Sequence, residues 1–145
     1  MASQVAIVSC AAYSEDLVAE KINLALEKIG GIRTYVSEGD MVLLKPNMLS
    51  ARTPDKGVTT HPAILKAVIN QVKDAGATPV VGDSPSGAIR GVAECWEKTG
   101  FAQVCREALV ELVSFEAEGT VDVPGRERVF HVAGKVMEAD VVINL

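Results

Sequence analysis

Three short polar clusters contain the residues of this chain that are best suited to chemistry. They occupy residues 43–47, 59–62 and 82–87. Each cluster lies where an apolar run ends or where a helical pattern begins. In an open α/β sheet, ligands bind at the carboxyl ends of parallel strands. The three clusters together therefore predict one shared site.

In the first cluster, Lys45 is a cation at the expected end of a buried strand. Its ammonium group could pair with a phosphate or carboxylate, or act as an amine nucleophile if it is desolvated. The structural alternative is a lysine whose stem is buried while its charge reaches solvent. Asn47 follows two residues later. It favours ligand binding, because an amide that faces a ligand often accompanies such a cation.

The second cluster contains Thr59, Thr60 and His61, followed by Pro62 at the expected first position of a helix. Free N–H groups at a helix start bind anions readily, although simple capping by these side chains is the structural alternative. His61 is predicted to lie in a loop and is the best acid or base candidate in the chain. His131 falls inside a weak strand pattern and is interpreted as structural.

The third cluster begins with Asp83 at an expected strand end. Asp83 could orient His61, accept a hydrogen bond from a ligand hydroxyl or bind a metal, but a solitary carboxylate is a poor metal ligand. Ser84, Ser86 and Gly87 form a turn whose backbone amides could bind an anion. An ordinary Asx turn is the alternative. The spacing matches neither a P-loop nor a dinucleotide-binding fingerprint.

Alternating strand and helix patterns must position these clusters. The alternation predicts an α/β fold with a mostly parallel sheet and helices on both faces. This three-layer arrangement is Rossmann-like, without a dinucleotide fingerprint. We expect strands at residues 5–10, 41–44, 79–82, 112–115 and 140–145, a small hairpin of 121–123 with 129–132, and helices over residues 15–29, 62–75, 89–96, 101–108 and 134–139.

The bulk composition indicates a single α/β domain over residues 1–145. The net charge of −5 and the aromatic content of 4% argue against a nucleic-acid partner. No apolar run approaches the roughly 20 residues needed to span a bilayer, and the start lacks the features of a signal peptide. We therefore expect a cytoplasmic protein without a membrane partner.

The three cysteines, Cys10, Cys95 and Cys105, form no Cys-x-x-Cys pair. They are interpreted as reduced, buried thiols. Their spacing does not suit a metal or an iron–sulfur cluster, so no cofactor is expected to be bound by this chain.

The last residues, 140–145, have the composition of a buried strand. A domain seldom ends in a core strand without a polar tail, so we expect more protein beyond Leu145. A core edge exposed at this place can drive the formation of a homodimer.

The clusters resemble the motifs of the domain of unknown function 362 family. The sequences Leu-Leu-Lys-Pro-Asn at 43–47, Thr-His-Pro at 60–62, Gly-Asp-Ser-Pro at 82–85 and Ala-Asp-Val-Val-Ile-Asn at 139–144 carry this resemblance over essentially the whole chain. The resemblance implies that the domain continues beyond this chain. Many members also carry ferredoxin-like cysteine motifs, so the parent protein could bind an iron–sulfur cluster outside these residues.

The sequence favours a domain that binds a small anionic metabolite as part of an enzyme linked to redox chemistry. Lys45 and the helix start at Pro62 would bind the anion, and His61, oriented by Asp83, would act as acid or base. One alternative is a non-catalytic module that supports a partner domain or an iron–sulfur domain. Another is a metal-dependent enzyme, in which Asp83 and His61 are joined by ligands from outside this chain.

Overall fold

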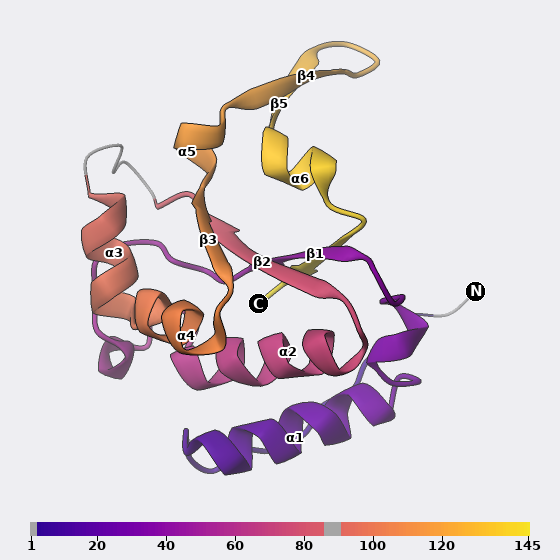
Figure 1. Ribbon diagram of the computed structural model, residues 1–145, viewed down its shortest axis with the longest axis vertical. Coiled ribbons are helices and arrows are strands. Elements are labelled where there is room, and N and C mark those ends of the chain that lie inside the picture. The colour runs from indigo at the N-terminus through magenta and orange to yellow at the C-terminus, as the bar shows by residue number, and fades with distance from the viewer. Residues whose placement is uncertain (1–2, 86–90) are drawn as a thin grey trace.

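A computed structural model describes residues 3–85 and 91–145. Strands and helices alternate through most of the chain, as expected for an α/β fold (Figure 1). In chain order the elements are α1 (Glu15–Glu27), η1 (Ile32–Thr34), β1 (Met41–Lys45), η2 (Pro54–Lys56), α2 (Pro62–Asp74), β2 (Thr78–Asp83), α3 (Val92–Thr99), α4 (Phe101–Ala108), β3 (Glu111–Ser114), α5 (Phe115–Glu118), β4 (Thr120–Pro124), β5 (Val129–Ala133), α6 (Gly134–Glu138) and β6 (Val141–Asn144).

Four strands form a sheet in the order β3-β2-β1-β6, and every neighbouring pair is parallel. In the register, Leu44 of β1 lies between Val81 of β2 and Ile143 of β6. All four strands therefore end at the same side of the sheet, called here the carboxyl edge. A separate antiparallel hairpin of β4 and β5 precedes β6 in the chain.

Apolar side chains cover both faces of the sheet, so its central strands have continuous rather than alternating apolar sequences. Leu44 and Val81 face the cluster formed by α2 and α4, which includes Leu65. Leu43 and Val80 face the opposite side, where α5 and α6 pack (Figure 1). The predicted three-layer α/β fold is therefore confirmed.

Helix α1 forms an additional layer, because it lies against α2 on the side away from the sheet (Figure 1). Val18 is buried between the two helices, where it packs with Ala63 and Ala67. The predicted hairpin and the short α6 helix are also present. In the described parts of the chain, no helix has the length and apolar composition needed to cross a membrane.

The predicted strand at residues 5–10 is wrong. These residues belong to no strand and run beside α1, with Val5 82% and Ile7 87% exposed. Ala6 and Val8 are half-buried. An apolar alternation satisfies the pattern of a strand, but strand formation also requires a neighbouring backbone with free hydrogen-bonding groups. Here the inward side chains pack against a helix instead.

Two strand ends also differ from the prediction. β3 ends at Ser114, because Phe115 begins α5 and turns the chain away from the sheet. The C-terminal strand was expected to be buried, but β6 alternates between half-buried and exposed residues. It lies at one end of the sheet with β1 as its single neighbour there, so only one of its sides is covered by another strand.

Candidate functional site

The first and third clusters meet at the carboxyl edge through an ion pair. The Lys45 Nζ atom lies 2.9 Å from Asp83 Oδ1, and the two residues end neighbouring strands. The backbone N–H of Met48 donates a hydrogen bond of 2.8 Å to Asp83 Oδ2. The Asp83 side chain is 7% exposed, whereas that of Lys45 is 38% exposed. A buried carboxylate therefore fixes a cation that still reaches solvent.

Asn47 and Thr60 join the first cluster to the second. The Asn47 N–H donates to Thr60 Oγ1 at 2.9 Å, and the Thr60 N–H donates to the Asn47 carbonyl at 3.0 Å. Thr60 Oγ1 also donates to the Leu145 carbonyl at 3.0 Å, beyond the end of β6. The Asn47 side chain donates to the Val58 carbonyl. In these contacts, Asn47 and Thr60 fix the loop that links β1 to α2.

Thr59 is half-buried beside this junction. Its hydroxyl oxygen is fully covered and has no hydrogen-bond partner among the described residues. Such groups are uncommon, because an unsatisfied buried hydroxyl costs free energy. The Thr59 hydroxyl therefore makes no hydrogen bond to Lys45 among the described residues.

His61 caps helix α2 through its side chain. Its Nδ1 atom accepts a hydrogen bond of 3.2 Å from the Ala63 N–H, so the neutral ring carries its proton on Nε2. The ring also stacks on Tyr13. Burial lowers the pKa of His61 from its usual value. Among the described residues His61 donates no hydrogen bond to Asp83, and Tyr13 and Ala63 orient the ring instead.

Glu116 also lies at the carboxyl edge, although it was not predicted as a site residue. Its carboxylate accepts hydrogen bonds from the hydroxyl groups of Ser84 and Ser114, the latter at 2.9 Å. Ser114 is the register partner of Asp83, so this cluster lies on the next strand after the ion pair. Partial burial tends to raise the pKa of Glu116, but hydrogen bonds from Ser84, its own backbone and Ser114 together lower it.

The position of Glu116 in the sequence could have indicated a site residue, because Glu116 directly follows a predicted strand. It was overlooked because Phe115 extends the apolar run and conceals where the strand ends. The predicted ligand-binding residues Ser86 and Gly87 lie outside the described residues.

Because Gly82 has no side chain, the side chains of Val113 and Phe115 can pack closely against β2 at this edge. A Cβ atom at this position would lie 2.7 Å from both Phe115 Cε1 and Val113 Cγ2. This distance is well inside van der Waals contact. The Phe115 ring therefore packs over Gly82, and this packing sets the start of α5 and the position of Glu116.

The carboxyl edge carries the ammonium group of Lys45 beside the carboxylates of Asp83 and Glu116. The ammonium of Lys45 has three donors, and Asp83 is its one ion-pair partner among the described residues. Within those residues, no group of three or more His, Cys, Asp or Glu side chains is arranged to bind a metal ion.

Two of the three cysteines lie in the hydrophobic core. Cys95 and Cys105 are buried in the core, and burial raises the pKa of both thiols, that of Cys105 to about 11. Because thiolates are the ligands of such clusters, these two residues are poor candidates. Cys10 is exposed and lies outside this core.

The fold and the site define an α/β domain whose polar residues gather at the carboxyl edge of a parallel sheet. The family described as Domain of unknown function (DUF362) matches residues 42–145, and the chain belongs to this family. The matched region contains all three polar clusters and, apart from Met41 at the start of β1, all the strands of the described residues.

A curated relative extends the comparison to the N-terminal residues. The chain is 32% identical over 146 residues to Thylakoid-associated protein sll1697 from Synechocystis sp.. The alignment covers all of this chain and 44% of that relative, so the chain spans less than half of the relative's length. No solved structure matches the chain.

Proposed function

We propose that the carboxyl edge of the sheet binds a small anionic metabolite and that the chain is part of a cytoplasmic enzyme. The observation that supports this proposal is the ion pair between Lys45 and Asp83. Asp83 is buried and fixed by the Met48 N–H, so it holds the ammonium at the edge while the Lys45 side chain remains 38% exposed. A phosphate or carboxylate can bind the remaining ammonium donors.

The neighbouring groups would contribute polar contacts. Ser84 and Ser114 present hydroxyl groups at the same edge, where Glu116 now accepts their hydrogen bonds. His61 is the proposed acid or base and would act through Nε2, because Nδ1 accepts the Ala63 N–H. A ligand would have to extend from Lys45 past Thr60 to reach it. We propose that any redox cofactor of the whole protein, such as an iron–sulfur cluster, is bound by residues outside this chain.

The test is a titration of the protein with inorganic phosphate and with a panel of phosphorylated and carboxylated metabolites. Lys45→Met should weaken binding of the recognised anion by about tenfold or more, because a charge-assisted contact is lost. Lys45→Arg retains the charge and should preserve part of the affinity. Lys56→Met is the matched control, because Lys56 is an exposed lysine in the loop after β1.

Thermal unfolding would verify that each variant is folded, since Lys45→Met leaves Asp83 without its cation. Equal affinities of Lys45→Met and the unsubstituted protein for every member of the panel would contradict the proposal.

A further inference from the structure

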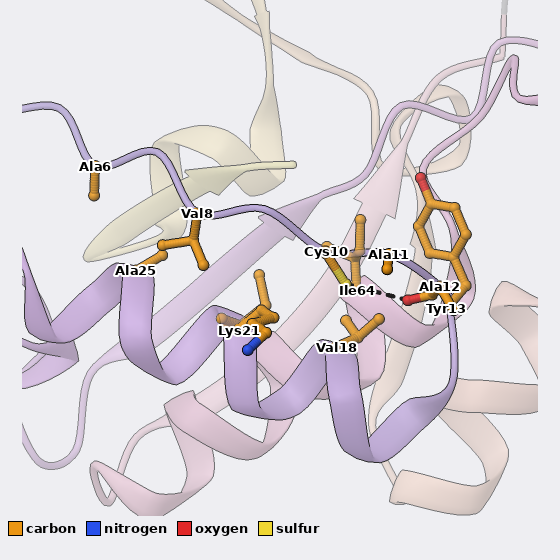
Figure 2. A pocket seen from close by; sticks show the side chains of 11 residues that line it. Ala6, Val8, Cys10, Ala11, Ala12, Tyr13, Val18, Lys21, Ala25 and Ile64 are labelled. Atoms are coloured by element: carbon orange, nitrogen blue, oxygen red, sulfur yellow. Dashed lines mark hydrogen bonds between the residues drawn. The ribbon is translucent and has the colours of Figure 1, made fainter.

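A largely apolar cavity is lined by residues from the N-terminal part of the chain, including Tyr13, which stacks on His61. It is partly open and lies between the extended N-terminal segment and helices α1 and α2, and its volume is about 340 Å³ (Figure 2). Ala6 and Val8 lie on one side, and Val18, Ile22 and Ala25 of α1 lie opposite with Ile64 of α2. The volume is in the range of small-molecule sites. Small alanine side chains leave this space open.

The cavity has one charged residue among the eleven described residues that line it, and this residue is Lys21. Its side chain is only 27% exposed, so most of its stem is covered. Its Nζ atom lies 2.6 Å from Glu20 Oε1, and Glu20 is 64% exposed. An exposed pair of adjacent residues contributes little stability, so another anion can replace Glu20 at modest cost.

The residues that line this cavity also include a cysteine. Cys10 lines it, and its Sγ atom donates a hydrogen bond of 3.1 Å to the Ala12 carbonyl (Figure 2). Cys10 is exposed, whereas Cys95 and Cys105 are buried. A reagent that reacts with accessible thiols should therefore react first at the cavity, and a molecule bound there should block it.

We propose that this cavity binds a free amphiphile with an unbranched or lightly branched hydrocarbon body and one anionic head group, such as a medium-chain carboxylate. The aliphatic walls would bury the hydrocarbon body, which is favourable by about 0.8 kcal/mol for each buried CH₂ group. The head group would pair with Lys21 in place of Glu20. Lys21 is the one charged residue among the described lining residues, so one anionic head group would neutralise the charge of the cavity.

The experiment measures the rate at which iodoacetamide alkylates Cys10, with sodium octanoate or decanoate present as monomers. Both carboxylates should slow the reaction in a saturable manner. Their affinity should increase by about fourfold for each added CH₂ group until the cavity is filled. Decylamine has the same hydrocarbon body with the opposite charge, and it should protect Cys10 much less.

Two variants test the site directly. Lys21→Met keeps an apolar stem and should raise the half-protecting concentration of decanoate by about fivefold, the size expected for one exposed ion pair. Ala25→Phe should fill the cavity and abolish the effect of decanoate. Lys28→Met and Ala19→Phe are the matched controls, because both positions are exposed on or just after α1 and do not line the cavity.

Peptide mapping would confirm that Cys10 is the alkylated residue, and circular dichroism would confirm that each variant is folded. Absence of protection by decanoate would overturn the proposal. Equal protection by decylamine would contradict the proposed preference for an anionic head group. Protection only above the critical micelle concentration would contradict binding of a free, monomeric amphiphile. None of these outcomes depends on Lys45, so the cavity is tested independently of the carboxyl edge.

Discussion

Tyr13 stacks on His61, with ring centroids 4.1 Å apart and an angle of 14° between the ring planes. This contact connects the N-terminal segment to the first turn of α2. It also covers one face of an imidazole whose Nδ1 atom caps that helix. A protonated imidazole could not accept the Ala63 N–H, so the fold favours the neutral ring. This capping hydrogen bond therefore makes the start of α2 sensitive to pH.

The stability of the protein should fall when the pH falls below about 6.5, the usual pKa of histidine. Because burial lowers the pKa of His61 in the folded state, the unfolded chain binds the proton more tightly. The contribution of neutral His61 is therefore fully present above the unfolded-state pKa. It is lost as the pH falls through the folded-state pKa. Urea unfolding at a series of pH values between 8 and 5 would measure this slope.

His61→Asn should reduce that slope, because asparagine can cap a helix but does not titrate. The matched variant His131→Asn removes the other histidine, whose Nδ1 atom lies 2.6 Å from Asp122 in the exposed β4–β5 hairpin. An unchanged slope in His61→Asn would show that another group causes the pH dependence.

Asp83→Ala should destabilise the fold by about 1–3 kcal/mol, because the Met48 N–H would lose its acceptor in a buried place. Asp83→Asn keeps an oxygen at this position and should cost less. The matched control Asp55→Ala removes an exposed carboxylate from the loop after β1 and should change stability little. Urea unfolding would measure these differences. Equal losses for Asp83→Ala and Asp55→Ala would contradict a structural role of the buried acceptor.

The central part of the fold could be predicted because its signals are local. The apolar runs that became β1 and β2 are short and bounded by turns, and Pro62 marks the start of α2. Residues 5–10 carry a similar apolar pattern, yet they pair with no strand and run beside α1 instead. A sequence pattern describes which side chains prefer burial, but not which element buries them.

The candidate site was predictable to the same extent. Lys45 and Asp83 meet because parallel strands share a carboxyl edge, and this follows from topology alone. The partner of His61 is Tyr13, which comes from a loop before α1. A contact between a loop and a distant helix start leaves no periodic signal in the sequence, so the expected role of Asp83 as its partner was not found.

Gly82→Ala should destabilise the protein by about 1–3 kcal/mol, the usual cost of an added methyl group in a closely packed core. The new Cβ atom would meet the Phe115 ring and Val113 at 2.7 Å, so α5 would have to move. Gly134→Ala is the matched control, because its Cβ atom would come no closer than 3.6 Å to the Glu118 carbonyl. Chemical unfolding would measure the free energy of unfolding of both variants. Equal destabilisation by Gly82→Ala and Gly134→Ala would contradict the close packing at Gly82.

Glu116→Gln should separate the structural role of the carboxyl edge from its proposed role in anion binding. The hydrogen bonds that lower the pKa of Glu116 below its usual value stabilise the fold above pH about 4.5, and this contribution is lost as the pH falls through the folded-state pKa. The variant should therefore show a smaller loss of stability between pH 6 and pH 3.5 than the unsubstituted protein. Glu118→Gln, two residues later in the same short helix, is the matched control.

In titrations with the recognised anion, Glu116→Gln should bind at least as tightly as the unsubstituted protein, because a negative charge has been removed from the edge that holds Lys45. The gain should shrink as salt is added, since ions screen charges separated by more than about 8 Å at physiological ionic strength. If Glu116→Gln instead weakened binding strongly while Lys45→Met did not, the edge would recognise its ligand through the carboxylate. The ligand would then be a hydroxyl compound or a cation rather than an anion.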